Sequence, residues 1–172
     1  MTMLSTTAWV AHDLGLASAF GGSLFGKLAL EPAVGEVSND DERHRVEDRA
    51  WKRFSVWNAI ALGTYAFTWF AGRKMLSGRE VSRAARGLTI AKDALVGTSV
   101  AVGVAANIFG RLLSRARQQN EPPTRERALH RTVDLLGDGQ LLLTAGILGV
   151  TSALAMQAGR STKFSAISRF LP

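Results

Sequence analysis

The sequence contains no cysteine, so disulfide bonds, thiolate chemistry and cysteine-ligated metal centres are excluded. Charge is missing over long distances as well, because no Asp, Glu, Lys or Arg occurs in residues 95–109 or 141–156. A helix built from either stretch would have no face suited to water. No stretch carries a catalytic, nucleotide-binding or metal-binding signature, so the motifs give no indication of an enzyme.

Four apolar stretches dominate what is present. They comprise residues 8–30, 56–75, 88–113 and 133–158. A hydrocarbon core ~30 Å thick is crossed by about 20 mostly apolar residues in a helix, so each stretch is long enough to span a bilayer. We therefore predict an all-α fold, an integral membrane four-helix bundle in which residues 1–172 form a single four-span transmembrane domain.

A soluble four-helix bundle is the alternative architecture. Such a bundle alternates charged and apolar residues every three or four positions along each helix. Here, most of the 21 Lys and Arg and the 14 Asp and Glu lie in the connections between the apolar stretches. This segregation favours the membrane bundle.

The net charge of +7 raises the question of nucleic acid as a partner. The basic residues, however, lie in loops beside apolar stretches, where Lys and Arg normally meet anionic lipid headgroups. We therefore expect membrane lipids, and no nucleic acid, as partners. Residues 1–11 contain no Lys or Arg and so lack the basic region of a signal peptide, which favours a first membrane span.

Local signals predict where the helices begin and end. No Gly or Pro interrupts residues 40–62, so a charged, solvated helix should run directly into the second span. Pro32 and Gly35 are expected to end the first helix, and Pro123 to start the fourth. Residues 77–80 have capping-box spacing and are expected to start the third helix.

The C-terminal tail has one local pattern. Its apolar residues Phe164, Ile167 and Leu171 share one helical face, with basic residues beside it. This pattern suits a short helix lying in the membrane interface, and a frayed terminus is the alternative.

Aromatic residues bracket the second span. Trp51 and Trp57 stand at its entry, and Trp69 and Phe70 at its exit, as expected for the aromatic belts of a membrane interface. Trp9 should lie in the same belt as Trp69. The second span lacks small-residue motifs, so we expect it to face lipid or a partner.

Small residues at four-residue spacing predict where helices pack, because membrane helices associate through close contact of small side chains. The candidate packing residues are Gly22, Gly26, Gly97, Ala101, Gly149 and Ala153. They can pack the bundle internally, or they can form a face for homo-oligomerisation.

Ionisable and amide residues within the spans are the candidate functional groups, because burying them in a membrane is costly. One end of the bundle is expected to collect the polar cluster Lys27, Asn58, Asn107, Arg111, Asp134 and Asp138. Asp134 and Asp138 lie four residues apart, on one face of a helix. An ion pair of Lys27 with Asp138, or of Arg111 with Asp134, would offset the cost of burial. Such a pair either locks the helices together or provides an ion-coupling carboxylate.

The other end is expected to collect His12, Asp13, Lys92 and Asp93. His12 or Lys92 could pair with either aspartate, within about one turn of the interface and so within reach of water. His12 and His130 resemble a bis-histidine haem pair, but they begin spans on opposite sides of the membrane, ~30 Å apart. We therefore expect no haem, no other cofactor and no metal.

A few residues distributed over the spans are similar to those of a known family. They are His12, Gly21-Gly22, Leu24-Phe25, Asn107 and Leu129-His130-Arg131. With these residues the chain resembles a small four-helix membrane family of unassigned biochemistry, found in bacteria and related to the eukaryotic cisplatin-resistance transmembrane protein. The resemblance implies a fold, not an activity. We expect the chain to be an integral protein of the bacterial inner (plasma) membrane.

The leading functional hypothesis is a non-enzymatic structural or accessory subunit of a larger membrane assembly. It follows from the absence of a deep, convergent polar site in the sequence pattern, together with small-residue faces suited to partners. Those partners are other membrane protein subunits or further copies of this chain. The alternative is a small oligomeric transporter or channel that uses Asp138 and Lys27 within the membrane.

Overall fold

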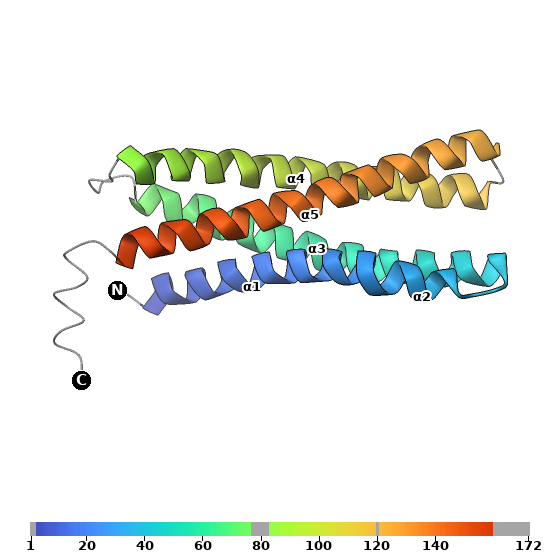
Figure 1. Ribbon diagram of the computed structural model, residues 1–172, viewed down its shortest axis with the longest axis horizontal. Helices are drawn as coiled ribbons and strands as arrows, with labels where there is room; N and C mark the ends of the chain where they lie inside the picture. Colours follow the sequence, from blue (N-terminus) through green and yellow to red (C-terminus); the bar gives the residue numbers. More distant parts are fainter. Residues whose placement is uncertain (1–2, 77–82, 120, 160–172) are drawn as a thin grey trace.

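The chain is folded into four long helical rods in the computed structural model, which describes residues 3–76, 83–119 and 121–159 (Figure 1). The first rod comprises α1 (Met3–Phe25), the π-helical segment η1 (Gly26–Leu30) and α2 (Glu31–Gly35). The other three are α3 (Asp40–Leu76), α4 (Arg83–Gln118) and α5 (Pro123–Gly159). The described residues contain no strand, so the predicted all-α class is confirmed.

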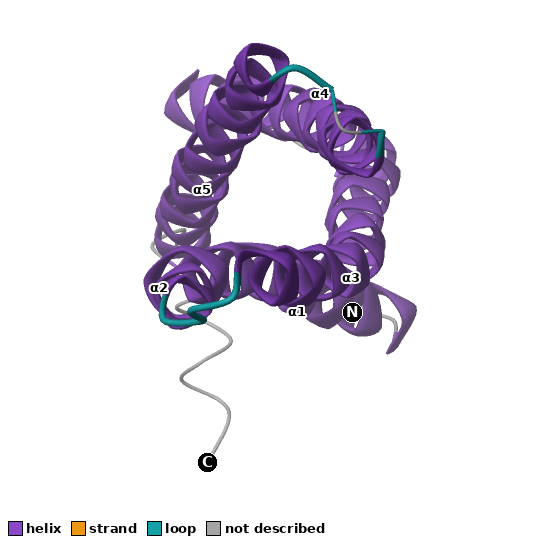
Figure 2. Cartoon of the chain, turned by 90° about the vertical axis from the view of Figure 1, so that its right-hand side faces the viewer, coloured by secondary structure: helices purple, strands orange, loops and turns teal. Residues whose placement is uncertain are grey.

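The rods form an antiparallel bundle. Figure 1 shows that α1 begins at the end of the bundle where α5 ends, and that successive rods alternate in direction. The closest pairs are α1 with α3 and α4 with α5, while α1 also borders α5 and α3 also borders α4. The end-on view in Figure 2 therefore has the rods in the order α1, α3, α4, α5 around the bundle axis. Short connections between successive helices produce this up-and-down arrangement.

Helix starts follow the local signals of the sequence. Asn39 caps α3, because its side-chain oxygen accepts a hydrogen bond from the Glu42 backbone N–H at 3.0 Å. The prediction that a charged helix runs without a break into the second apolar stretch is confirmed by α3. The predicted start of the fourth helix at Pro123 is also confirmed. The expected start at 77–80 and the C-terminal interfacial helix lie outside the described residues.

Of the two residues expected to end the first rod, Gly35 does end it, whereas the helix passes through Pro32. A proline inside a helix lacks an N–H and its ring collides with the carbonyl four residues earlier. The backbone N–H of Glu31 reaches back five residues, to the carbonyl oxygen of Gly26, so the helix is widened just before the proline. This wider turn admits Pro32 into the first turn of α2, and the rod continues to Gly35.

Two of the four predicted spans meet the length and hydropathy required to cross a bilayer. They lie within Arg86–Gln118 of α4 and Pro123–Met156 of α5. In the first rod, Asp13 and Lys27 interrupt the apolar stretch 8–30, and the longest uncharged segment left within it is 14–26, about 20 Å of helix. By length and composition, α4 and α5 could therefore each cross a membrane, and the four-span bundle stays a prediction.

The core is narrow and depends on close approach of helices. Leu16, Val96 and Ile147 are fully buried at its centre. At Gly15 of α1, an added Cβ would lie 2.9 Å from the backbone oxygen of Ala61 in α3, so only glycine allows this contact. The core also includes Tyr65 and Trp69 of α3. The expectation that α3 faces lipid or a partner is therefore wrong for this face, while Trp57 and Phe67 of the same helix are exposed.

The predicted packing residues divide into two groups. Gly22 and Gly26 lie against the rings of Phe54 and Trp51, where an added Cβ would come within 2.5 and 2.8 Å. The other candidates do not pack inside the chain in the same way. Gly97 and Gly149 are exposed with nothing within 4 Å of an added Cβ, Ala101 is exposed, and Ala153 is half-buried.

Candidate functional site

A row of buried polar side chains runs through the core and draws on every rod. Such groups are costly to bury unless they are hydrogen-bonded, so their partners are informative. The buried polar residues are His12, Lys92, Ser99, Gln140 and Thr144, with the fully buried Tyr65 beside them.

The deepest contact joins Lys92 of α4 to His12 of α1. Lys92 is 0% exposed and His12 is 2% exposed, and the Lys92 Nζ lies 3.0 Å from the His12 Nε2. The opposite ring nitrogen, Nδ1, lies 2.9 Å from the backbone carbonyl oxygen of Tyr65. Because a carbonyl only accepts, Nδ1 carries the hydrogen and Nε2 offers its lone pair to Lys92.

This arrangement limits the charge of the pair. If His12 were doubly protonated, its Nε2–H would face the amine of Lys92 with no acceptor between the two cations. The pair therefore holds at most one positive charge, and Lys92 is the group placed to carry it. The Trp69 ring centroid lies 4.1 Å and the Trp9 centroid 6.0 Å from the Lys92 Nζ, which favours a cation there.

Neighbouring groups hold the pair in position. Thr68 lies 3.2 Å from the His12 Nδ1 and donates its own hydroxyl hydrogen to the carbonyl of Thr64, so its oxygen can accept from the histidine. The Trp69 indole N–H donates to the carboxylate of Asp93 at 2.9 Å.

The contact between His12 and Lys92 corrects the sequence expectation for this end. Asp13 and Asp93 were expected to be their partners, with water in reach. The structure instead places Lys92 against His12, and both side chains are closed to water.

A second set of hydrogen bonds links α3, α4 and α5. The Tyr65 hydroxyl is hydrogen-bonded to the Ser99 hydroxyl, and the Gln140 side-chain amide donates to Ser99 at 2.8 Å. The remaining oxygen of Gln140, Oε1, is buried without a hydrogen-bond partner among the described residues. Thr144 donates to the Gln140 carbonyl one turn earlier, which satisfies its hydroxyl within α5.

The polar cluster predicted for the opposite end is only partly assembled. The ion pair of Lys27 with Asp138 is present, with 2.6 Å between nitrogen and oxygen, and both side chains are half-exposed. Asp134 contacts His130 of its own helix at 2.9 Å and not Arg111, which is exposed.

The two asparagines of that cluster lie elsewhere. Asn107 donates to the carbonyl of Gly103 in its own helix at 3.1 Å. Asn58 lines a groove between α1 and α3, and its buried Oδ1 has no partner among the described residues. The six predicted residues therefore do not converge on one site.

The two histidines considered as haem ligands lie toward opposite ends of the bundle. His12 is in the first half of α1 and His130 is near the start of α5, and these two helix starts are at opposite ends (Figure 1). The separation argued from the sequence is therefore correct. Within 3–76, 83–119 and 121–159, no three His, Asp or Glu residues are grouped as metal ligands.

A charged network at the far end of the bundle was not predicted. Arg117 of α4 contacts Glu47 and Asp48 of α3 at 3.2 and 3.4 Å, and Glu126 of α5 at 3.1 Å. Its side chain is mostly buried among the three carboxylates, so it joins three rods where they extend beyond the apolar part of the bundle.

The sequence did carry a signal for part of the buried row. Lys92 and Ser99 are seven residues apart, which places both on one face of α4, and Val96 and Gly103 share that face. Polar residues repeating on one face inside an apolar stretch indicate an internal polar row. Tyr65, Ser99 and Thr144 were not predicted, because a single hydroxyl side chain in an apolar helix does not by itself indicate a buried polar contact.

Comparison with known proteins finds no relative of this chain. No protein-family model, no curated protein and no solved structure matches the chain. The resemblance to the small bacterial four-helix family therefore stays a prediction.

Proposed function

We propose that all four rods cross a bilayer as an integral membrane bundle in the plasma membrane of a bacterium. The observation that supports this most strongly is the low burial of the apolar windows in α4 and α5, of which only 17% is buried inside the molecule. An equally apolar helix at the core of a soluble protein would be mostly covered by its neighbours.

Exposed apolar side chains extend the argument to the other rods. Phe67 and Trp57 of α3 are 75% and 71% exposed, and Leu14 of α1 is exposed as well. Soluble monomers rarely leave large apolar side chains uncovered over a contiguous surface. Lipid around the bundle would cover them.

The spacing of charges supports a membrane of ordinary thickness. In α4, the uncharged segment lies between Asp93 and Arg111, which are about 27 Å apart along the helix. This length is close to the ~30 Å of a hydrocarbon core. The helices continue past Arg111 into the charged network of Arg117, which would stand outside the bilayer.

Within that membrane, the chain acts as a non-enzymatic structural or accessory subunit of a larger assembly. The supporting observation is that Gly97 and Gly149 are exposed and unpacked, although membrane helices use such residues for close contact. Small residues at membrane depth allow the backbone of a neighbouring helix to approach, whether from another subunit or from a second copy.

The test uses native membranes solubilised in mild detergent. The wild-type chain is expected to run as a complex, and Gly97→Leu combined with Gly149→Leu should release it as an 18.5 kDa monomer with unchanged helicity. Gly63→Leu is the control, because Gly63 is also exposed with nothing within 4 Å but belongs to α3. A wild-type chain that runs alone and still functions in cells would contradict an accessory role.

A second candidate function is ion-coupled transport by an oligomer. The observation that favours it is the pair of Lys92 and His12, because ionisable groups at membrane depth commonly mark ion or proton pathways. The ion pair of Asp138 with Lys27 is half-exposed and would be a second ionisable site on the transport pathway. Flux in proteoliposomes should be abolished by Lys92→Met or Asp138→Asn, and flux unchanged in both variants would dismiss transport through these groups.

A further inference from the structure

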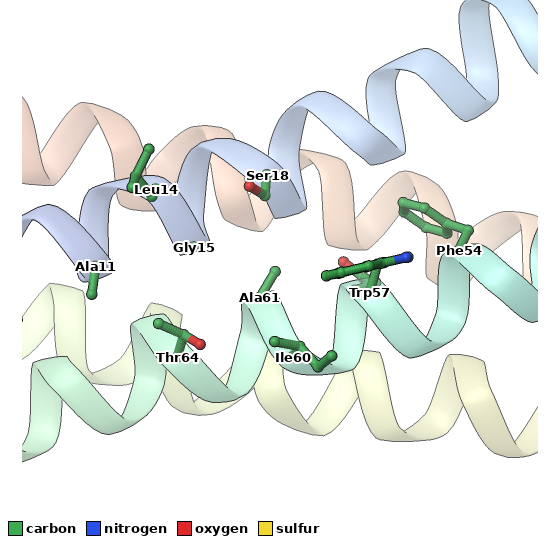
Figure 3. A pocket seen from close by; sticks show the side chains of 10 residues that line it. Ala11, Leu14, Gly15, Ser18, Phe54, Trp57, Ile60, Ala61 and Thr64 are labelled. Carbon is green, nitrogen blue, oxygen red and sulfur yellow. The ribbon is translucent and has the colours of Figure 1, made fainter.

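A groove of about 340 Å³ runs along the outer surface between α1 and α3. Figure 3 shows Leu14, Gly15 and Ser18 of α1 on one wall and Trp57 and Ile60 of α3 on the other. The walls are predominantly apolar, and Leu14, Trp57 and Ile60 are exposed. The volume is within the range of pockets that hold small ligands, roughly 300–1,000 Å³.

Basic residues continue one wall of the groove toward the charged end of the bundle. Arg53 lies four residues before Trp57 and seven before Ile60, so all three share one face of α3. Arg49 lies one further turn away, beside the same line. Both arginines are exposed, and neither has an ion-pair partner among the described residues.

We propose that this groove holds one acyl chain of an anionic phospholipid whose phosphate contacts Arg53 and Arg49. The assignment depends on the membrane location proposed above. An acyl chain fits the apolar walls beside Trp57 and Ile60, and a phosphate fits the two guanidinium groups one and two turns beyond Trp57. Trp57 then lies at the level of the lipid backbone, where tryptophan is enriched in membrane proteins.

The distribution of charge favours a lipid over a partner helix. A lipid carries its charge at one end of an apolar chain, and here the basic groups lie at one end of an apolar groove. A helix docked along the whole groove would need carboxylates at one end, beside Arg49 and Arg53, and apolar side chains over the rest of its length.

The test measures lipid binding to the full-length chain in detergent. The purified chain is stripped of lipid and titrated with phosphatidylglycerol or with phosphatidylcholine of the same acyl chains, and bound lipids are counted by native mass spectrometry. We expect one phosphatidylglycerol per chain, bound roughly thirtyfold more tightly than phosphatidylcholine. Each of the two arginines contributes on the order of 1 kcal/mol toward a lipid with net negative charge, and the choline cation cancels that charge in phosphatidylcholine.

Matched variants separate the two halves of the site. Arg49→Gln with Arg53→Gln should remove the preference for phosphatidylglycerol, whereas Arg45→Gln with Lys52→Gln should keep it. The control removes the same charge from exposed positions about a quarter turn around α3 from Arg53.

The apolar half is tested by filling the groove. Ser18→Phe should weaken the binding of both lipids, and Ala17→Phe, at an exposed position one residue away on α1, should not.

Three results would overturn the site. The first is equal affinity of the wild type for both lipids. The second is an equal loss of lipid preference in the Arg49/Arg53 double variant and in the Arg45/Lys52 control. The third is unchanged lipid binding after Ser18→Phe. These results differ from a failure of the membrane location itself. A chain that stays in the membrane pellet after an alkaline wash but shows no lipid preference disproves only the site, whereas a chain released by that wash disproves the location.

Discussion

Lys92 is a fully buried lysine, so its surroundings must replace the hydration of its ammonium group. An ammonium group removed from water loses several kcal/mol of hydration even after the protein relaxes. Here, a histidine lone pair and the faces of two tryptophan rings replace that hydration. The partner of Lys92 in this contact is therefore a neutral ring and not a carboxylate.

Removing either partner of this contact should have unequal effects. His12→Leu leaves a buried ammonium without its acceptor, which costs more than the loss of a partner by a neutral group, about 3 kcal/mol or above, because the unsatisfied group is charged. Lys92→Met leaves one neutral ring nitrogen unpaired, at about 1–3 kcal/mol. We expect thermal unfolding in detergent to show the larger loss for His12→Leu, and the double variant to recover part of it. A larger loss for Lys92→Met would contradict the assigned charge state.

His12 and Lys92 could be selected from the sequence as ionisable groups at membrane depth, but their contact could not be predicted. Which residues of α1 and α4 lie at the same height depends on how each of these rods is placed against α3 and α5, which lie between them. The register of α1 against α3 is set by close contacts such as Gly15 against Ala61. The sequence pattern predicts the approximate height of each residue along the bundle, and the packing of the rods determines which residues come into contact.

Close approach between α1 and α3 depends on single glycines. Gly22 faces the Phe54 ring, which lies 2.5 Å from the position of an added Cβ. Gly21, its neighbour in the chain, has nothing within 4 Å of an added Cβ. The two adjacent positions therefore differ only in what they face.

Gly22→Leu should destabilise the fold by about 1–3 kcal/mol, because the larger side chain would force the two rods apart. Gly21→Leu should be neutral or slightly stabilising, because an exposed helical glycine costs roughly 1 kcal/mol relative to better helix formers. Thermal unfolding of both variants in the same detergent measures the difference. Equal stability of the two variants would mean that α1 and α3 are not in the contact described.

Arg117 is expected to hold three rods together at the charged end. Arg117→Gln leaves Glu47, Asp48 and Glu126 close together without the cation that separates them. Amide hydrogen exchange should rise around these three residues, more at low salt than at high salt, while the exchange of residues 94–110 stays unchanged. Unchanged protection at the charged end would show that the network contributes nothing to stability.

The helices themselves were largely predictable. Each predicted apolar stretch lies inside one rod, and the charged start of α3 follows from residues 40–62 without Gly or Pro. The first rod ends at Gly35 as expected. It is not broken at Pro32, because a π-helical turn accommodates the ring, a local adjustment that composition alone does not indicate. Composition also did not indicate that Tyr65 and Trp69 of α3 turn inward to bind polar partners, while Trp57 and Phe67 of the same helix stay exposed.

The whole molecule is polarised along its length. Apolar side chains cover the outside where the buried polar row runs inside, and charged side chains take over toward Arg117 and Glu126. A soluble bundle has the opposite arrangement, with its polar groups outside and its apolar groups inside. The proposed lipid groove and the exposed glycines have a direct rationale if lipid surrounds the apolar part, as we propose.

The most direct measurement is fractionation of native membranes with an alkaline carbonate wash, followed by extraction in detergent. The membrane bundle predicts that the chain stays in the pellet through the wash and enters solution only with detergent. Recovery of a folded, monodisperse chain in the supernatant of high-speed centrifugation without detergent would contradict it.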